Sequence, residues 1–274
     1  MIEDADPADP GVSPLAHFGA EVRLERERLG LTREQVGKAA HCGYSLVAKI
    51  EAGKRVPTLD FAEACDRLFP HGHGRFGRLW PLALKCAFPT WFRRYVELEW
   101  ETKALRMFHP VILPGIVQTE AYARAILSSG RLADTDDAVT ARMERQRIFE
   151  RNDPPELWVV LDEGVLTRTV GSPDVMREQL VKLLDLAETR PHVVQIVPEG
   201  GGHTYHGWGS PFGLMSFNEG ADVVHVDGWP KGYLLAEPGD VGTAGRTYDL
   251  LRAMALPPKE SAGLIESVIK DRYS

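Results

Sequence analysis

The chain has 274 residues, enough for one large domain or two domains of ordinary size. Its 32 Lys and Arg residues against 39 Asp and Glu residues give a formal net charge of -7, which excludes a protein that binds nucleic acid or an anionic membrane over most of its surface. A site for a polyanion must therefore be local. The 3 cysteines are widely spaced and predict neither a disulfide framework nor a zinc site.

Residues 1–14 are acidic and Pro-rich, and they lack the basic and apolar regions of a secretory signal peptide. No window of the sequence approaches the roughly 18 consecutive apolar residues that a membrane-spanning helix needs. We therefore expect a disordered N-terminal tail on a cytoplasmic protein that has no membrane partner.

Residues 15–75 have the apolar spacing of four short helices joined by tight turns. Thr32, followed three residues later by Gln35, predicts a capping box at the start of the second helix. In the third helix, Val47 and Ile50 have the spacing of residues that face a core. The pattern predicts a small all-α domain.

The third helix is predicted to direct Tyr44, Ser45 and Lys49 away from this core. Two helices joined by a tight turn, the second exposing polar side chains, have the geometry that places a recognition helix in the DNA major groove. Hydroxyl and ammonium groups can bond to base edges or phosphates, and a tyrosine ring can contact a thymine methyl group. We predict that these three residues read bases, the alternative being an ordinary solvated helix face.

Three basic residues flank this helix-turn-helix pattern. Lys54 and Arg55 follow the third helix, and Arg33 lies at the start of the second. At the start of the second helix, the Arg33 guanidinium and the positive end of the helix dipole both attract phosphate. We predict that all three residues contact DNA phosphates.

Residues 29–59, LGLTREQVGKAAHCGYSLVAKIEAGKRVPTL, resemble the signature of phage-repressor-like (XRE-type) helix-turn-helix domains over their whole length. The departures are Gly37, where that family usually has alanine, and His41, where glycine is common. In the family, the glutamate of the IExG turn commonly pairs with an arginine of the first helix. The resemblance therefore implies a structural ion pair between Glu51 and Arg26.

After residue 75 the sequence pattern changes from short helices alone to a mixture of helices and strands. Residues 76–90 are expected to form a linker helix, and residues 91–274 a larger α+β domain. One helix is predicted from Thr90 to Met107, and short β-rich runs bounded by Gly, Pro, Asn or Asp begin after Pro155. The last four strands are joined by short links, which predicts a largely antiparallel sheet.

This second domain resembles the C-terminal domain of the WhiJ-like, antitoxin-like transcriptional regulators of actinomycetes. The likeness extends in order over most of residues 91–273 and rests on the runs LEWETKALRMFHPVILPGIVQTEAYARAIL, ARMERQRIF, LWVVLDEGVLTRTVGSPDVMREQL and SPFGLMSF. It implies a transcription factor whose second domain has no established chemistry and is often encoded beside a small partner protein.

Side chains that could support catalysis are few. His203 and His206 have no third ligand at a recognisable spacing, so neither a metal site nor a bound cofactor is predicted. The Gly-rich loop that contains them leads into a strand, which favours a flexible loop at a sheet edge or pocket rim over a phosphate site. We expect no catalytic residue and no enzymatic activity. The other side chains considered lie in or just after predicted strands: Asp162, Glu163, His225 and Asp227.

Two further motifs lie in the second domain. PGIVQT, followed by a helix that Thr119 is placed to cap, is interpreted as packing between helices and sheet. ARMERQRIFERND predicts a charged helix that is either a solvated face or an interaction surface for an acidic partner.

The sequence thus predicts a regulator that binds an operator in double-stranded DNA. We expect a homodimer, because one helix-turn-helix reads too few base pairs for useful specificity. The second domain is expected to dimerise and to bind a small regulatory partner protein or an effector. The alternatives are an antitoxin-like module in which partner capture is primary, and a small-molecule sensor or enzyme fused to a helix-turn-helix. An ordered pocket around Trp208 would favour the sensor.

Overall fold

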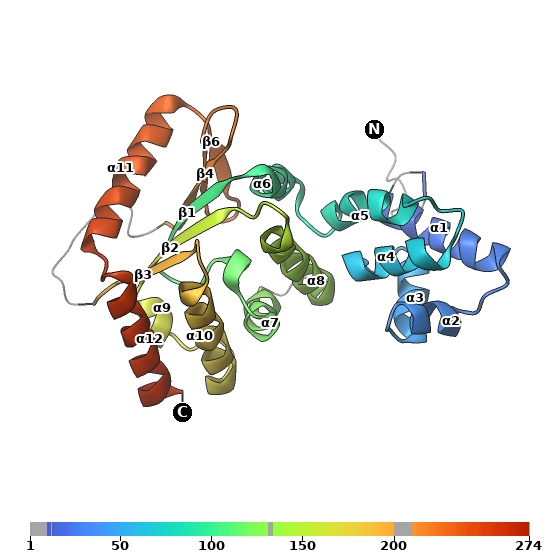
Figure 1. Cartoon of the computed structure of the whole chain (residues 1–274), viewed down its shortest axis with the longest axis horizontal. Helices are drawn as coiled ribbons and strands as arrows, with labels where there is room; N and C mark the ends of the chain where they lie inside the picture. The colour runs from blue at the N-terminus through green and yellow to red at the C-terminus, as the bar shows by residue number, and fades with distance from the viewer. Residues whose placement is uncertain (1–9, 12, 131–133, 200–209, 274) are drawn as a thin grey trace. The chain divides into compact units, whose positions relative to one another are not determined.

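A computed structural model describes residues 10–11, 13–130, 134–199 and 210–273 (Figure 1). The chain divides into two compact units. The first contains the described residues up to Pro89 together with Asp136–Glu144, and the second contains Thr90–Thr135 and the chain from Arg145 onward.

The first unit is a helical bundle around an aromatic core. The rings of Phe18 and Phe76 meet edge to face with centroids 5.7 Å apart, and Phe69 lies 5.4 Å from Phe76. All three side chains are completely buried. Its helices before residue 90 are α1 (Pro14–Arg28), α2 (Arg33–Ala39), α3 (Tyr44–Glu51), α4 (Leu59–Leu68) and α5 (Arg75–Lys85).

Helix α5 differs from the linker that the sequence predicted for residues 76–90. Phe76, Trp80 and Leu84 recur at intervals of four residues and are buried in the first unit. The indole Nε1 of Trp80 donates to the carbonyl oxygen of Pro57 at 3.0 Å. The Gly/His-rich segment before α5 is therefore a turn inside the N-terminal domain, and the domain boundary expected at residue 75 is wrong.

The second unit surrounds one six-stranded sheet with helices. Among the described residues, no helix combines the length and the apolar character that crossing a membrane requires. The helices are α6 (Thr90–Glu101), α7 (Glu120–Ser129), α9 (Gly164–Thr167), α10 (Pro173–Glu188), α11 (Pro238–Met254) and α12 (Pro258–Arg272), with 3-10 turns at Gly115–Val117 and Arg147–Glu150 and with α8 (Thr135–Gln146) shared between the residue ranges of the two units.

The sheet has the order β3-β2-β1-β4-β5-β6. β1 pairs with β2, and β2 with β3, in parallel, whereas the other three pairings are antiparallel. The α+β class predicted from the sequence is confirmed, and the sheet is mixed: β3, expected among the antiparallel strands, lies at the parallel edge. The strands are β1 (Ala104–His109), β2 (Glu156–Asp162), β3 (Val193–Val197), β4 (Phe212–Ser216), β5 (Val223–Val226) and β6 (Tyr233–Leu235).

The helix predicted from Thr90 to Met107 is interrupted. α6 ends at Glu101, and the chain continues as β1, the strand between β2 and β4. The hydroxyl of Thr102 lies 2.9 Å from the carbonyl oxygen of Ser216, and Lys103 donates its backbone N–H to the same carbonyl at 2.8 Å. Pairing with a distant strand therefore overrides the helical pattern.

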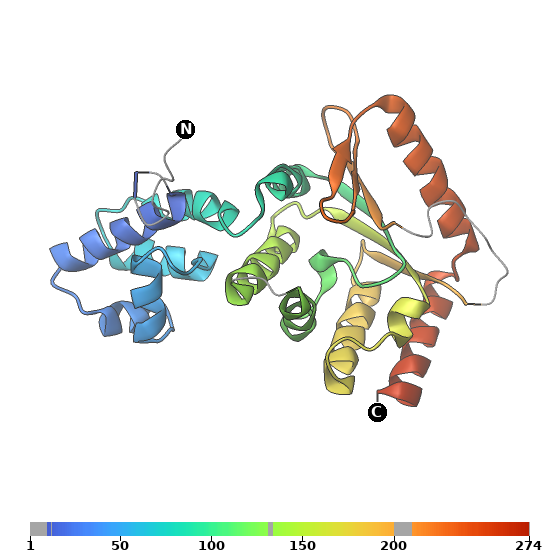
Figure 2. The same cartoon turned by 180° about the vertical axis from the view of Figure 1, so that it is seen from behind.

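The two faces of the sheet are covered differently. Leu105 and Met107 of β1 contact the core beneath α6, α7, α9, α10 and α12, whereas Phe108 faces the opposite core. α11 covers that opposite face, where its Tyr248 and Leu251 are fully buried (Figures 1 and 2). Alternate residues of a strand point to opposite sides of the sheet, so successive apolar residues, such as Met107 and Phe108, supply both cores.

Candidate nucleic-acid interface

The turn between α2 and α3 is fixed by local hydrogen bonds and backbone geometry. Gln35 Oε1 accepts the backbone N–H of Thr32 at 2.7 Å and Thr32 Oγ1 accepts that of Gln35 at 3.3 Å, so the predicted capping box is confirmed. His41 adopts a φ of 53°, the left-handed region that explains the glycine common at this position. A Cβ on Gly37 would lie 2.6 Å from the Cys42 carbonyl oxygen, so the turn is close enough to favour glycine over alanine.

Helix α3 has one buried face and one exposed face. Val47 and Ile50 are buried in the core of the unit, as their spacing predicted. Tyr44 is 49% exposed, and Ser45 and Lys49 are also exposed. The structure therefore brings the three predicted base-reading side chains together on the exposed face of one helix.

The ion pair between Arg26 and Glu51 is present. Arg26 donates from Nε to Glu51 Oε1 at 2.5 Å and from Nη2 to Oε2 at 3.0 Å. The Glu51 side chain is fully buried. Burial raises the pKa of its carboxyl, but the hydrogen bonds and charges of Arg26 and Arg33 outweigh burial, so the pKa lies below its ordinary value. The carboxylate thus ties α1 to the end of α3.

Arg33, predicted to contact phosphate, is a second partner of this carboxylate. Its Nε donates to Glu51 Oε2 at 2.8 Å. Its Nη1 lies 3.5 Å from the Tyr44 hydroxyl, and its guanidinium carbon lies 5.9 Å from the centre of the Tyr44 ring. Arg33 therefore positions a predicted base-reading residue, and a phosphate contact stays a prediction for the exposed part of its guanidinium.

Lys54 and Arg55 differ in their surroundings. Lys54 is exposed after the end of α3. The Arg55 side chain is only 19% exposed, because its guanidinium lies 3.4 Å from both Asp136 Oδ2 and Asp137 Oδ1. Its Nη2 also donates to Thr140 Oγ1 at 3.3 Å. Of this predicted phosphate-binding pair, only Lys54 points freely to solvent.

Acidic residues of α8 also bind the backbone between α3 and α4. Asp137 Oδ1 accepts the N–H of Val56 at 2.9 Å, and Glu144 Oε2 accepts the N–H of Leu59, the first residue of α4, at 3.2 Å. These hydrogen bonds explain why residues 136–144 belong to the first compact unit. No local pattern in the sequence signals contacts between segments so far apart.

The comparisons with known proteins agree with this division. Residues 17–70 match a family described as a helix-turn-helix domain, and residues 92–267 match a domain of unknown function, DUF5753. The chain belongs to the DUF5753 family. No curated protein and no solved structure matches it. The helix-turn-helix match supports a DNA-binding regulator.

In this DUF5753 protein, the acids considered for catalysis bind the backbone. Asp162 Oδ1 accepts the N–H of Gly164 at 2.8 Å, and Glu163 Oε2 accepts that of Glu199 at 2.6 Å. Across the ranges that the structure describes, no three His, Cys, Asp or Glu side chains are grouped to hold a metal ion. His203, His206 and Trp208 lie outside the described residues.

His225 is buried against the rings of α6. Its ring centroid lies 4.2 Å from that of Tyr95, and its Nδ1 lies 3.6 Å from Asp227 Oδ1. Burial, assisted by the charge of Arg145, lowers the pKa of His225 to about 4. This histidine is therefore neutral near pH 7 and belongs to the core.

The run ARMERQRIF is predicted to be either a solvated helix face or an interaction surface for an acidic partner. At Arg145 it is neither. That side chain is buried and donates to Glu99 from Nε at 2.7 Å and from Nη2 at 2.8 Å. Gln146 donates to the carbonyl oxygens of Gly115 and Gln118 at 3.1 and 2.8 Å. The structure thus agrees with the packing role of PGIVQT, and Thr119 caps α7 as predicted.

Proposed function

We propose that this protein is a sequence-specific transcriptional regulator of the XRE type that reads its operator with α3. The observation that supports it best is the exposure of Tyr44, Ser45 and Lys49 on a helix whose end is fixed by Glu51. A recognition helix must be held rigidly while its polar face stays accessible, and this arrangement meets both conditions.

The proposed DNA contacts divide into two kinds. Tyr44, Ser45 and Lys49 read base edges, and Lys54 with the exposed part of Arg33 holds phosphates. The net charge of the chain is -7, so the attraction of these few cations is local. Binding is expected to weaken as salt rises, with a slope set by the number of phosphates that they neutralise.

We propose further that two copies bind together and that the DUF5753 unit supplies the contact. A single recognition helix reads few base pairs, and linked half-sites raise specificity and affinity without new protein–DNA contacts. A small partner protein or an effector that binds the same unit would then control the regulator, as the resemblance to WhiJ-like, antitoxin-like regulators implies. We propose regulation rather than catalysis, because Asp162 and Glu163 already serve backbone groups.

Selection from a random duplex library with the full-length protein tests the proposal. We expect enrichment of a motif with two half-sites about 34 Å apart, or a multiple of that distance. Sedimentation of the protein with the selected duplex then gives the number of bound copies. A library that remains unenriched would contradict sequence-specific binding, and one copy on one half-site would contradict the dimer.

A further inference from the structure

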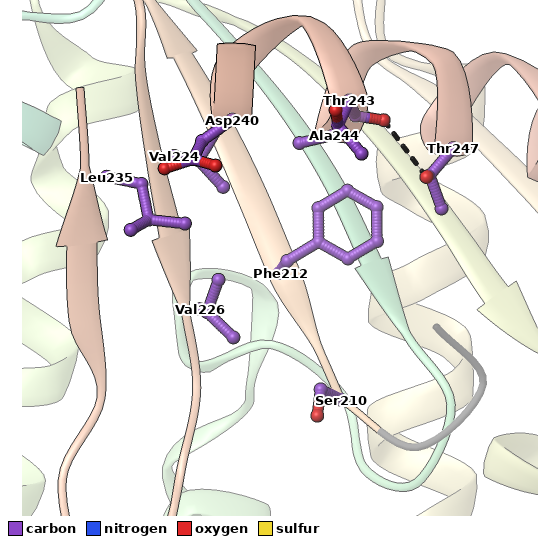
Figure 3. Close-up of a pocket in the computed structure, with 9 residues that line it drawn as sticks. All are labelled: Ser210, Phe212, Val224, Val226, Leu235, Asp240, Thr243, Ala244 and Thr247. Carbon is purple, nitrogen blue, oxygen red and sulfur yellow. Dashed lines mark hydrogen bonds between the residues drawn. The ribbon is translucent and has the colours of Figure 1, made fainter. Parts of the chain in front are cut away.

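The face of the sheet beneath α11 contains a cavity of about 310 Å³ (Figure 3). Strands β4, β5 and β6 form its floor, and the first half of α11 forms its roof. Small-molecule sites in proteins begin at about this volume.

The sequence of α11 explains why the cavity exists. In the second half of the helix, Tyr248 and Leu251 are fully buried against the sheet. The first half has Gly242, Ala244 and Gly245, which are too small to fill the same space. A Cβ on Gly245 would reach only ordinary contact, 4.0 Å from a methyl group of Leu214. The gap between helix and sheet therefore opens where the helix residues become small.

The floor of the cavity is apolar. On the floor, Phe212 and Val224 are buried, and Val226 and Leu235 are half-buried. Ala244 of the roof is also half-buried. A ligand with an apolar body would remove the remaining apolar surface from water, which favours binding.

The side of the cavity rim that α11 forms is rich in hydrogen-bond acceptors. Thr243 Oγ1 donates to the Gly239 carbonyl at 2.8 Å and accepts from Arg246 at 3.1 Å, and Thr247 Oγ1 donates to the Thr243 carbonyl at 3.0 Å. Both threonine hydroxyl protons are thus used within α11. The Asp240 carboxylate makes no side-chain hydrogen bond or ion pair with the described residues, and it projects from the start of α11 toward the floor strands in Figure 3. These groups of α11 favour a ligand that carries its own hydrogen-bond donors.

We propose that this cavity binds a small organic cation, in which a primary or secondary ammonium group pairs with Asp240 and an apolar ring or branched chain fills the space beneath Ala244. A carboxylate and an ammonium group form a charge-assisted hydrogen bond, which is stronger than a neutral one. An anionic ligand would instead meet the charge of Asp240. This inference goes beyond DNA binding, and its test uses no DNA.

The probe is 2-phenylethylammonium, added to full-length protein labelled at Val and Leu methyl groups. We expect saturable shifts of the methyl resonances of Val224, Val226 and Leu235. The neutral isostere 2-phenylethanol is expected to bind about tenfold more weakly, because it cannot form the ion pair.

Two variants locate the binding. Asp240→Asn is expected to lower the affinity for 2-phenylethylammonium about tenfold. Asp249→Asn makes the same charge change on α11 outside the cavity and is expected to leave affinity unchanged. Ala244→Phe fills the space and is expected to abolish the methyl shifts, with circular dichroism as the check that it folds.

Absence of saturable shifts at these methyl groups would overturn the site. Equal affinity for the amine and the alcohol, or an unchanged affinity in Asp240→Asn, would overturn the cationic class of ligand. The Asp240→Asn comparison stands even if Ala244→Phe does not fold, because the charge change adds no volume.

Discussion

Arg55 and Asp137 form an ion pair inside the DNA-binding unit, with 3.4 Å between Arg55 Nε and Asp137 Oδ1. The same carboxylate oxygen accepts the backbone N–H of Val56 at 2.9 Å. A basic residue predicted to hold DNA phosphate thus already has an acidic partner, and Asp136 supplies a second. DNA must compete with these carboxylates if Arg55 is to bind phosphate.

Replacing Asp137 by Asn tests this competition. The amide oxygen can still accept the N–H of Val56, but the negative charge is lost. We expect affinity for duplexes of every sequence to rise and the slope of log affinity against log salt to steepen by up to about one unit. Salt titration with a random duplex measures both. Asp134→Asn, an equal charge change just before α8, is the control, and an unaltered slope in Asp137→Asn would show that Arg55 is purely structural.

Replacing Lys54 and Arg55 one at a time is expected to have different effects on DNA binding and on stability. Lys54→Ala removes an exposed cation, so the salt slope becomes shallower by about one unit while thermal stability is unchanged. Arg55→Ala also removes the ion pairs that its guanidinium forms with Asp136 and Asp137, so the melting temperature falls. Both variants keep their preference for operator over random DNA, and loss of that preference with an unchanged slope would mean that they read bases.

Glu51→Ala is expected to destabilise the first unit. Arg26 and Arg33 would lose the buried carboxylate that both bind, a loss that reaches about 3–5 kcal/mol for a fully buried pair. Denaturant unfolding followed by circular dichroism measures the change in the free energy of unfolding. A variant that unfolds like the wild type but fails to bind DNA would identify Glu51 as a DNA contact instead.

The same carboxylate makes the stability of the first unit depend on pH. Because the pKa of Glu51 is lowered in the folded state, its contribution is complete above the unfolded value of about 4.3 and is lost as pH falls through the lower folded value. The difference in unfolding free energy between wild type and Glu51→Gln is therefore expected to shrink steadily below about pH 4. A difference that stays constant down to pH 2 would contradict this assignment.

Local signals predicted the helix-turn-helix well. The capping box at Thr32, the buried pair Val47 and Ile50 and the partner of Glu51 depend on residues close in sequence or on a familiar motif. The spacing of Phe76, Trp80 and Leu84 also marks α5 as an amphipathic helix, and only the Gly/His segment before it suggested a linker. Short-range periodicity therefore held the information for the buried face of α3 and for α5.

Long-range pairing could not be predicted in the same way. β1 follows α6 after two residues, and its identity as a strand comes from β2 and β4, far along the chain. The acids at Asp137 and Glu144 reach the α3–α4 turn only in the folded unit. Contacts of this kind leave no period in the sequence, so the partner of Arg55 and the mixed sheet were missed.

The exposed face of α3 is expected to determine operator affinity. Lys49→Ala and Tyr44→Ala should each weaken operator binding by about 1–3 kcal/mol if the side chains touch bases. Both side chains are exposed, so the melting temperature should change little. Tyr44→Phe keeps the ring near Arg33 and removes only the hydroxyl, which separates ring contact from hydrogen bonding in the same assay.

Sequence-specific reading by α3 is tested most directly by the ratio of affinities for operator and scrambled duplex, measured at one salt concentration with full-length protein. We expect the wild type to prefer the operator by about 10³ or more, and Lys49→Ala to lower that preference about tenfold. Equal affinity of the wild type for both duplexes, or an unchanged preference in both Lys49→Ala and Tyr44→Ala, would contradict sequence-specific reading by α3.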